Sequence, residues 1–333
     1  MSYSCGQMKA EQTACSPLPI LIRLPNWVGD VCMCLAALER ILRLGVPIAV
    51  CARPWAKDLL AGMKLDSFIP VTGKFGADLS TLRAWHRLHP EYQKAIILSD
   101  SLSSALLFKL AGFQSAGYKD DGRSLLLRWP FNKPQPRQHA VRSWFSLTEQ
   151  SLATWGYSRQ SLEIPVRPFL PLTREHLLGA QQAMEQAGLK PKAFVLIAPT
   201  AVGLHKGQIK VWQHFDELTK HLQKAGLRVV MCPPPSEQAA ALQAAPSAQM
   251  LAPLGLGSFA ALAHEATLVI CNDSGVSHIC AAVGAEQLTL FGVTDPARTG
   301  PWTPNSVNLG QNGHWPALED VISSVQQLVA IQK

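Results

Sequence analysis

Gly29 and Asp30 are the first residues along the chain whose side-chain types and position suggest a role in binding or catalysis. They follow the hydrophobic stretch 20–24 and lie where a helical pattern begins. Glycine permits a tight turn and a close approach of the backbone. An aspartate at a helix start can cap free N–H groups, or it can face a ligand and accept a proton as a general base. A helix N-terminus stabilises a carboxylate, so we expect Asp30 to have a lowered pKa and to be ionised at neutral pH.

A second polar group follows the hydrophobic stretch 193–197. Thr200 comes just after it, and His205, Lys206 and Lys210 lie in a segment with two glycines. Hydroxyls, small residues and lysines after a strand suit the oxygens of a phosphate. A solvated basic loop is the alternative for an isolated lysine. We favour Lys210 over Lys206 as the phosphate ligand because Lys210 adjoins the following helix.

The third group follows the hydrophobic stretch 267–271 and contains Asp273, Ser274, Gly275 and His278. Asp273 or Ser274 can cap the helix that begins here, and the free N–H groups of that helix can hold phosphate or sugar oxygens. His278 lies four residues beyond Ser274 and so shares its helix face. Taken alone, the turn is an ordinary cap, and a lone histidine is more often structural than ligand-binding.

The segment 119–145 concentrates positive charge and aromatic rings. Its basic side chains and rings are Arg123, Arg128, Lys133, Arg137, His139, Arg142, Trp129, Phe131 and Trp144. Such a mixture can bind nucleic acid, and arginines suit bidentate contact with phosphate. A solvated loop is the alternative for each residue taken singly.

The composition describes a globular protein large enough for two domains. The chain has 333 residues, 47% hydrophobic and 16% charged, with a net charge of +7. This charge can attract nucleic acid, anionic lipid or phosphorylated substrates. No hydrophobic run is long enough to span a membrane. The polar N-terminus lacks a signal sequence, so we expect no export and a cytoplasmic protein.

The eight cysteines indicate reduced thiols that act as small hydrophobic residues, since several lie in apolar stretches. No Cys-x-x-Cys pair occurs, and Cys32 and Cys34 diverge on a helix, which argues against a zinc site. No Asp-x-Asp pair occurs either. We therefore expect neither a metal nor a cofactor.

Short hydrophobic runs alternate with helical patterns along both halves of the chain. The expected strands are 20–24, 47–51, 95–100, 115–118, 193–199, 227–232, 266–272 and 287–292. The helical patterns are 30–44, 54–63, 78–88, 101–111, 212–225, 236–245, 258–265 and 275–283. This alternation predicts an α/β protein with two doubly wound, Rossmann-like parallel sheets.

Prolines mark the expected boundary between two domains. The segment 163–173 carries three of them, and proline resists helix and sheet interiors. The expected parts are a flexible tail at 1–19, a first domain at 20–165, a linker at 166–172 and a second domain at 173–333. The last helix, 317–331, either stays on the second domain or crosses back onto the first. Ligands of such sheets bind beyond the carboxyl ends of the strands, so the three polar groups should face one cleft.

Two longer strings carry a family resemblance. One is LPNWVGDVCMCLAALERIL at 24–42. The other is Asp-Ser-Gly-x-x-His-x-x-Ala-Ala from Asp273, followed by Phe-Gly-x-Thr-Asp-Pro and Pro-Trp. Together they resemble glycosyltransferase family 9, the lipopolysaccharide heptosyltransferases, and are closer to the members that add the second heptose. The resemblance implies the GT-B architecture and an inverting transfer of heptose from a nucleotide-diphosphate sugar, ADP-heptose, to the lipopolysaccharide inner core.

The resemblance also implies roles for single residues. Asp30 would be the general base. The donor would contact Thr200, Lys206, Lys210, Asp273, Ser274, Gly275 and His278, with Thr294 and Asp295 at the cleft edge. The acceptor would contact Asn26, Gly29, Arg123, His139 and Arg142. Lysine, hydroxyls and a helix dipole would stabilise the departing diphosphate without a metal.

Two stretches depart from the family pattern. KGQIKVW at 206–212 replaces the usual Lys-Arg-Trp-Pro string, which leaves the identity of the phosphate-binding lysine open. Three prolines at 233–235 stand where relatives have a glycine near the nucleotide, and they can reshape the base pocket. Glu237 can contact a ribose hydroxyl or cap the helix 236–245.

The implied partners are a nucleotide sugar, an acidic lipid-linked saccharide and, peripherally, the cytoplasmic face of the inner membrane. We expect a monomer that binds no nucleic acid. The alternatives are a GT-B transferase with another nucleotide sugar or acceptor, and a non-catalytic protein that binds phosphorylated glycans or nucleic acid. The transferase hypothesis requires Asp30 to face residues 273–275 across the cleft.

Overall fold

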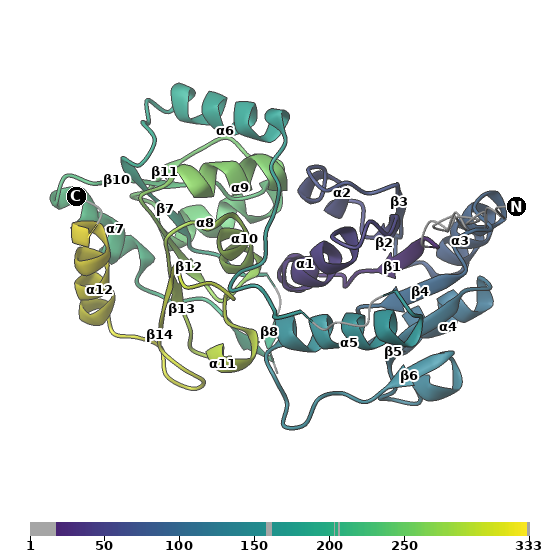
Figure 1. The fold of residues 1–333 in the computed structure, drawn as a ribbon. Helices are drawn as coiled ribbons and strands as arrows, with labels where there is room; N and C mark the ends of the chain where they lie inside the picture. Colours follow the sequence, from purple (N-terminus) through teal and green to yellow (C-terminus); the bar gives the residue numbers. More distant parts are fainter. Residues whose placement is uncertain (1–17, 158–161, 203, 206, 332–333) are drawn as a thin grey trace, which may run out of the picture.

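Two parallel sheets, each with helices packed around it, form the two halves of the molecule (Figure 1). The computed structural model describes residues 18–157, 162–202, 204–205 and 207–331. Most of the expected tail at 1–19 therefore lies outside the described residues. The fold is the predicted α/β architecture with two domains.

The first sheet has the strand order β3-β2-β1-β4-β5-β6. Its strands are β1 (Ile20–Arg23), β2 (Ile48–Ala52), β3 (Ser67–Pro70), β4 (Lys94–Ile97), β5 (Gln114–Tyr118) and β6 (Trp129–Phe131). Its helices are α1 (Val28–Leu42), α2 (Ala56–Leu59), α3 (Phe75–Leu88), α4 (Leu102–Leu110), the short 3-10 turn η1 (Arg123–Leu125) and α5 (Ala140–Thr154). The central strand β1 is fully buried because helices cover both faces of the sheet.

The second sheet repeats this topology with the order β11-β10-β7-β12-β13-β14. Its strands are β7 (Phe194–Ala198), β10 (Arg228–Met231), β11 (Gln249–Met250), β12 (Leu268–Asn272), β13 (Gln287–Leu290) and β14 (Ser306–Leu309), and a small hairpin joins β8 (Leu204–His205) to β9 (Gln208–Ile209). Its helices are α6 (Arg174–Gln186), α7 (Phe215–Lys224), the turn η2 (Pro235–Glu237), α8 (Gln238–Ala244), α9 (Leu256–Glu265), α10 (Gly275–Val283), α11 (Pro296–Thr299) and α12 (Leu318–Ile331).

The strand order reverses beside β1 in the first sheet and beside β7 in the second. In doubly wound sheets this switch point, at the carboxyl ends of the strands, is where ligands bind. The loops that leave β1, β7 and β12 lie there. They carry the three polar groups that the sequence singled out.

The helices α1 and α10 join the two domains. They lie side by side between the two sheets in Figure 1 and pack against each other. One hydrophobic core, which includes Leu35 of α1 and Ile279 of α10, therefore runs through both domains. The last helix, α12, packs against α7, and Val321 and Val325 enter the core of the second sheet. It stays on the second domain and does not cross back onto the first.

The segment 163–173 connects the two halves without a helix or strand of its own until α6 begins. The Leu170 N–H donates to the Ala282 carbonyl at 3.1 Å, so this stretch is held against the end of α10. The limits of the linker at 166–172 stay a prediction.

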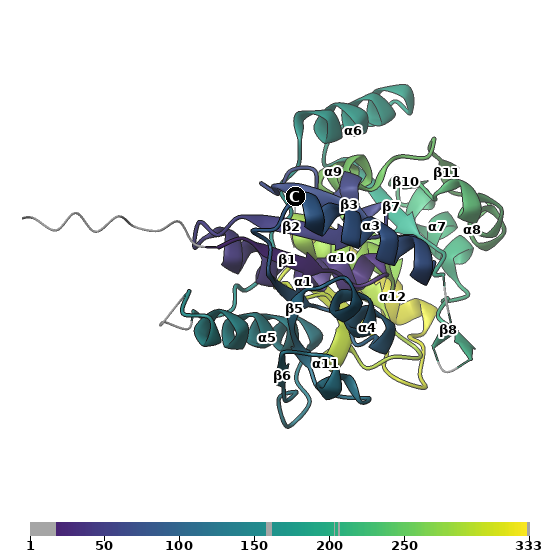
Figure 2. The same cartoon turned by 90° about the vertical axis from the view of Figure 1, so that its right-hand side faces the viewer.

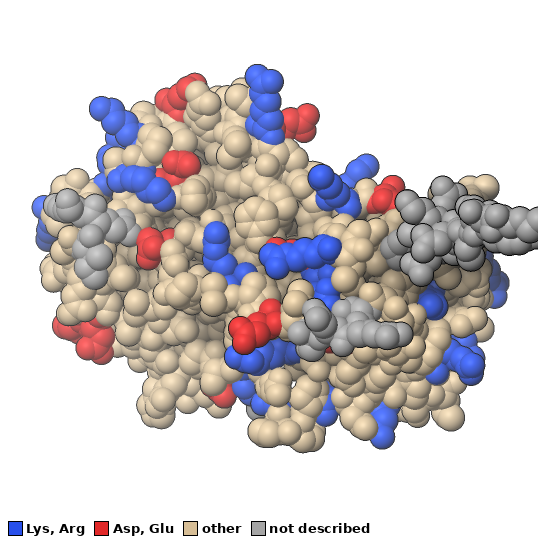
Figure 3. Space-filling view, in the orientation of Figure 1, with Lys and Arg blue, Asp and Glu red and all other residues tan. Residues whose placement is uncertain are grey.

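Lysines and arginines are scattered over the face shown in Figure 3 and do not gather in one patch there. The six described cysteines are buried free thiols, as their apolar neighbours predicted. None of the helices in the described parts of the chain has both the length and the apolar character to span a bilayer.

Candidate active site between the two domains

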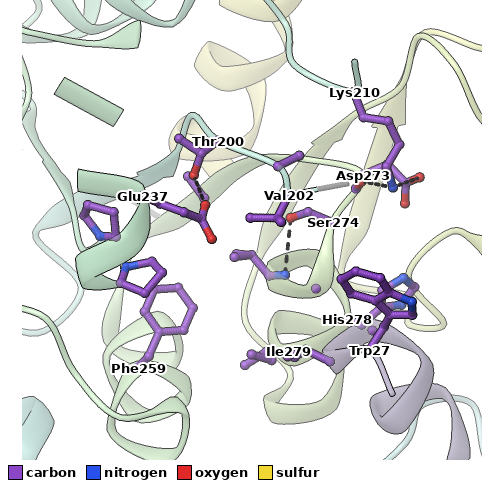
Figure 4. A pocket seen from close by; sticks show the side chains of 18 of the residues that line it. Trp27, Thr200, Val202, Lys210, Glu237, Phe259, Asp273, Ser274, His278 and Ile279 are labelled. Atoms are coloured by element: carbon purple, nitrogen blue, oxygen red, sulfur yellow. Dashed lines mark hydrogen bonds and ion pairs between the residues drawn. The ribbon is translucent and has the colours of Figure 1, made fainter. Parts of the chain in front are cut away.

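A cavity of about 570 Å³ lies where the three polar loops meet. The start of α1 contributes Gly29 and Asp30, the β7 loop contributes Thr200, and the start of α10 contributes Ser274 and His278. Lys210 and Asp273 line it as well (Figure 4). Asp30 and residues 273–275 therefore belong to one cavity. The structure thus brings together the two loops on which the transferase hypothesis depends.

Asp30 lies in the first turn of α1, three residues after the N-cap residue Trp27. No hydrogen bond of its carboxylate to the described residues is found, so it does not cap the helix. It is half-buried. The carboxylate is therefore held at a helix N-terminus inside the cavity with its acceptor sites open.

Burial raises the pKa of Asp30, because the carboxylate loses water in the cavity. The positive charge of Lys210 lowers the pKa, and the negative charges of Asp100 and Asp273 raise it. The prediction of a lowered pKa for Asp30 is wrong, because the loss of water on burial is the largest contribution and raises the pKa. A higher pKa makes the ionised carboxylate a stronger base.

Two glycines let the helix starts of the two domains come into contact. A Cβ atom on Gly29 would lie 2.6 Å from Cδ2 of His278. A Cβ atom on Gly275 would lie 3.0 Å from Cβ of Val28. The distance at Gly29 is shorter than real side-chain contacts, so glycine is required there for this close approach, whereas a side chain at Gly275 would need Val28 to move by a few tenths of an ångström.

Lys210 is fixed to the third loop. Its Nζ donates to the Asp273 carbonyl at 2.8 Å and lies 3.5 Å from Asp273 Oδ2. The same carboxylate accepts a hydrogen bond of 2.6 Å from the Thr294 hydroxyl. Asn272 also holds the chain next to Lys210, because its Oδ1 accepts the N–H of Trp212, two residues further along, at 2.9 Å. These contacts hold the ammonium group beside the start of α10.

Ser274 is the N-cap of α10, and its hydroxyl accepts the Val276 N–H at 3.3 Å. The N-terminus of this helix carries a partial positive charge and faces the cavity, which suits a phosphate. His278 lies one turn further in and is buried. Burial lowers its pKa to about 4, so the ring is neutral at pH 7. It offers hydrogen bonds without positive charge.

The opposite end of the cavity is formed by the β7 and β10 loops. Thr200 donates its hydroxyl hydrogen to Glu237 Oε2 at 2.5 Å. Pro233 and Pro234 supply apolar wall around this pair, as does Phe259 (Figure 4). Glu237 lies at the end of η2 and makes no side-chain cap in the described structure, so its carboxylate serves the cavity wall.

Among the described residues no cluster of three or more His, Cys, Asp or Glu side chains could hold a metal ion. Among the described residues, the charged groups that line the cavity from the second domain are the Lys210 ammonium and the carboxylates of Asp273 and Glu237. The site is therefore one carboxylate on the first domain opposite a lysine and a helix N-terminus on the second.

Comparison with known proteins identifies the family. Residues 81–327 match the family glycosyltransferase family 9 (heptosyltransferase). The chain belongs to glycosyltransferase family 9. It is 28% identical to lipooligosaccharide heptosyltransferase 2 of Haemophilus influenzae and 26% identical to lipopolysaccharide heptosyltransferase 2 of Escherichia coli, with 85% of each chain covered in both cases. The resemblance to heptosyltransferases is thus confirmed, and the chain is a glycosyltransferase.

Solved structures show the same fold. The E. coli ADP-heptose lipopolysaccharide heptosyltransferase II has a TM-score of 0.74 at 23% identity, over 94% of this chain and 99% of that one. A family 9 member from Veillonella parvula has a TM-score of 0.78 at 16% identity, over 94% and 97%. An E. coli heptosyltransferase with ADP has 0.71 at 20%, over 93% and 99%. The architecture of this family 9 chain is GT-B, as predicted.

The structure excludes Arg123 as an acceptor ligand. Its side chain is 1% exposed. The guanidinium donates to the carbonyls of Ser99 and Asp120 and to Asp100 Oδ1. All its donors point into the protein, so the prediction of acceptor contact at Arg123 is wrong.

His139 also has a structural role that the sequence did not predict. Its Nδ1 accepts the Val141 N–H at 3.2 Å, and its Nε2 donates to the Gly300 carbonyl of the second domain at 2.9 Å. Burial lowers its pKa. Both ring nitrogens are occupied, so His139 joins the domains and is not free for an acceptor.

Three further predicted residues have separate outcomes. Arg142 is exposed, with its guanidinium 5.0 Å from the centre of the Trp302 ring, and it stays an acceptor candidate. Asn26 is exposed outside the cavity and accepts a hydrogen bond of 2.7 Å from Arg23. Asp295 caps α11. Lys206 lies outside the described residues, as does the His205 side chain.

Proposed function

We propose that this family 9 transferase moves a heptose from ADP-heptose to a lipid-linked acidic saccharide with inversion at the anomeric carbon. The acceptor hydroxyl oxygen forms the new bond to that carbon while the bond from carbon to the phosphate oxygen breaks. Asp30 takes the hydroxyl proton, and ADP leaves. The observation that supports this is the placement of Asp30 in one cavity with Lys210 and the N-terminus of α10.

The second domain would hold the donor. The Lys210 ammonium and the N–H groups at the start of α10 would meet the negative charge that develops on the departing diphosphate. Neutral His278 would hydrogen-bond to the sugar or phosphate without competing with Lys210 for charge. The wall of Pro233, Pro234 and Phe259 would receive the base, with Glu237 near the ribose. One relative is named for ADP-heptose and another is solved with ADP, which favours adenine.

The acceptor would approach from the first domain, where Asp30 and the exposed Trp27 line the cavity. Relatives named for lipopolysaccharide and lipooligosaccharide favour a lipid-linked core saccharide as acceptor. We propose a monomer that meets this acceptor at the cytoplasmic face of the inner membrane. Asp30 lies outside the matched range 81–327, so its role rests on the geometry.

The test is Asp30→Asn, assayed for heptose transfer with EDTA present throughout. Transfer should fall at least about a hundredfold, since a general base typically contributes that much or more. The thermal shift produced by ADP should stay as in the unchanged protein, because the proposed nucleotide site lies on the other domain. This shift should also exceed that of GDP or UDP, because the proposed donor carries ADP. The anomeric configuration of the product should be inverted.

Glu39→Gln is the matched control, because Glu39 lies on the same helix and pairs with Arg43 at the surface. It should keep full activity. Full turnover by Asp30→Asn would refute the role of Asp30, and loss of activity in EDTA would refute metal independence.

A further inference from the structure

The helix α4 exposes a stripe of leucines on its outer face. Leu102, Leu106 and Leu110 are 49%, 36% and 43% exposed. They are spaced four residues apart, so they lie on one side of the helix. Leu125 of η1 is 81% exposed and lies beside them, because the Lys109 ammonium on α4 donates to its carbonyl at 2.7 Å. Grouped exposed leucines of this kind indicate a binding surface.

Positive charge surrounds this leucine patch, which consists of Leu102, Leu106, Leu110 and Leu125. Arg83 of α3 donates from Nε to the Leu110 carbonyl at 3.0 Å, at one end of the stripe. Arg83, His86 and Arg87 line a surface hollow of about 800 Å³ next to Ala111. The exposed cations on α3, α4 and 123–131 are Arg83, Arg87, Lys109 and Arg128.

Negative charge is scarce on the same elements. In the sequence of α3, α4 and 123–131 the only acidic residue is Asp78. It is buried, and it accepts hydrogen bonds from the N–H groups of Thr72 and Gly73. The nearby Asp100 and Asp120 are both paired with Lys133. Asp121, just before η1, is an exposed acidic residue, so the patch is apolar at its centre and mainly basic around it.

The helices α3 and α4 lie on the side of the first sheet that faces away from the second domain, and only one end of α4 points toward the cleft (Figure 1). The helices α3 and α4 are turned toward the viewer in Figure 2. Asp100, two residues before α4, is near enough for its charge to act on Asp30. The nine residues of α4 extend about 14 Å from that end. The N-terminal end of α4 is therefore the part of this face that lies nearest to the acceptor side of the cavity.

We propose that the face formed by α3, α4 and residues 123–131 docks on an anionic lipid bilayer. The leucine patch enters the boundary between headgroups and acyl chains, and Arg83, Arg87, Lys109 and Arg128 meet acidic headgroups. Interfacial binding combines these two contributions, buried apolar area and attraction to anionic lipid. This deepens the proposed function, because it names the surface that would bring the cleft to a lipid-linked acceptor.

A second copy of the chain fits this face less well than a bilayer does. A symmetric dimer would place the same patch on both sides of the interface. The four cations would then face four cations, with no exposed acidic residue on these elements to pair with them. An anionic bilayer supplies the missing negative charge.

The test is cosedimentation of the full chain with vesicles. Binding should be strong to vesicles with 30% phosphatidylglycerol, and at least about tenfold weaker to pure phosphatidylcholine or in high salt. The triple variant Leu102→Ser/Leu106→Ser/Leu110→Ser should weaken binding to the anionic vesicles at least tenfold. Arg83→Glu/Arg87→Glu should do the same. Leu125→Ser/Arg128→Glu changes residues outside α3 and α4. It serves as a third variant if the leucine triple variant or the arginine double variant folds poorly.

Matched controls come from the second domain. Leu177→Ser/Leu178→Ser/Leu242→Ser removes three other exposed leucines, and Lys190→Glu/Lys224→Glu reverses two other exposed cations. Both should bind vesicles as the unchanged protein does. The patch variants should keep their rate on a delipidated acceptor and lose rate only on an acceptor embedded in vesicles.

The outcomes separate this inference from the proposed function. Vesicle binding that is lost in folded patch variants supports docking even if no transfer activity is found. Equal binding by patch and control variants, or no binding by the unchanged protein, overturns docking and leaves the transferase proposal intact. A dimer in sedimentation equilibrium that the leucine changes dissociate would assign the patch to a second copy and also overturn it.

Discussion

The charge on Asp30 depends on the groups that face it across the cleft. Burial raises its pKa, Asp100 and Asp273 add to the rise, and Lys210 opposes it. A base must be unprotonated to work, so the rate should fall as the pH drops through this pKa. The lysine proposed to bind the diphosphate therefore also affects the pH at which the base becomes active.

We expect kcat/KM to decline on the acid side at a pH above the usual aspartate pKa of about 4. Lys210→Met removes the positive charge that lowers the pKa of Asp30. The acid limb should therefore move to higher pH, in addition to an overall loss of rate. Lys220→Met, on the surface of α7, should leave the limb in place. A limb that stays or moves to lower pH in Lys210→Met would show that Asp30 is not the group that titrates.

At the residue scale, many of the residues that line the cavity could be predicted from the sequence, but the burial of individual side chains could not. Asp30, Lys210 and Ser274 follow strand ends, and strand ends can be predicted from hydrophobic runs. Arg123 was misassigned because the left-handed Gly122, with φ of 77°, turns the chain so that the arginine is buried. Asn272 was missed, although an asparagine at the end of the buried run LVICN is a usable signal.

At the element scale the contact between α1 and α10 positions the base. The helix starts meet through Gly29 and Gly275, with Val28 and the His278 ring packed against them. The hydrophobic face of each helix follows from the sequence pattern, but the pairing of two helices that begin at Val28 and at Gly275 does not. The edge strands β3, β6, β11 and β14 were also missed. All four strands are short and only partly buried. A strand of this kind does not need the long hydrophobic run by which the central strands were predicted.

Gly29→Ala should separate these helix starts. Its Cβ would lie 2.6 Å from the His278 ring, and overpacking of this kind costs about 1–3 kcal/mol of unfolding free energy. Urea unfolding should show this loss, and transfer activity should fall. Gly76→Ala on α3 is the control, because nothing lies within 4 Å of its new methyl group. It should be neutral or stabilise by up to about 1 kcal/mol.

The double variant Gly29→Ala/His278→Ala tests the cause. Removing the ring makes room for the methyl group, so the double variant should be less destabilised than the sum of the two single variants. Strict additivity would mean that Gly29 does not owe its role to His278.

At the scale of the whole molecule, described residues in the helix pair α1–α10 and on either side of it fix the relative position of the two domains. The helix pair α1–α10 lies between them. On one side His139 donates to the Gly300 carbonyl, and the Arg142 guanidinium lies 5.0 Å from the Trp302 ring centre. On the other, Asp58 of α2 accepts the Gly257 N–H of α9 at 3.0 Å. A base on one domain and a donor site on the other are useful only if these contacts align them.

Asp58 acts as a helix cap supplied by the other domain. Besides the Gly257 N–H, its carboxylate meets Nε2 of the buried His176 at 3.4 Å, while His176 Nδ1 accepts the Thr173 N–H. Asp58→Ala leaves the start of α9 without this acceptor and should cost about 0.5–2 kcal/mol, as the loss of a cap does. Amide exchange in the first turn of α9 should quicken, and transfer should slow.

The ADP-induced thermal shift should persist, because the proposed nucleotide site lies wholly on the second domain. Asp58→Asn keeps an oxygen for the Gly257 N–H and should behave nearly as the unchanged protein. If Asp58→Ala left both amide exchange and transfer unaltered, the contact between α2 and α9 would have no part in aligning the domains.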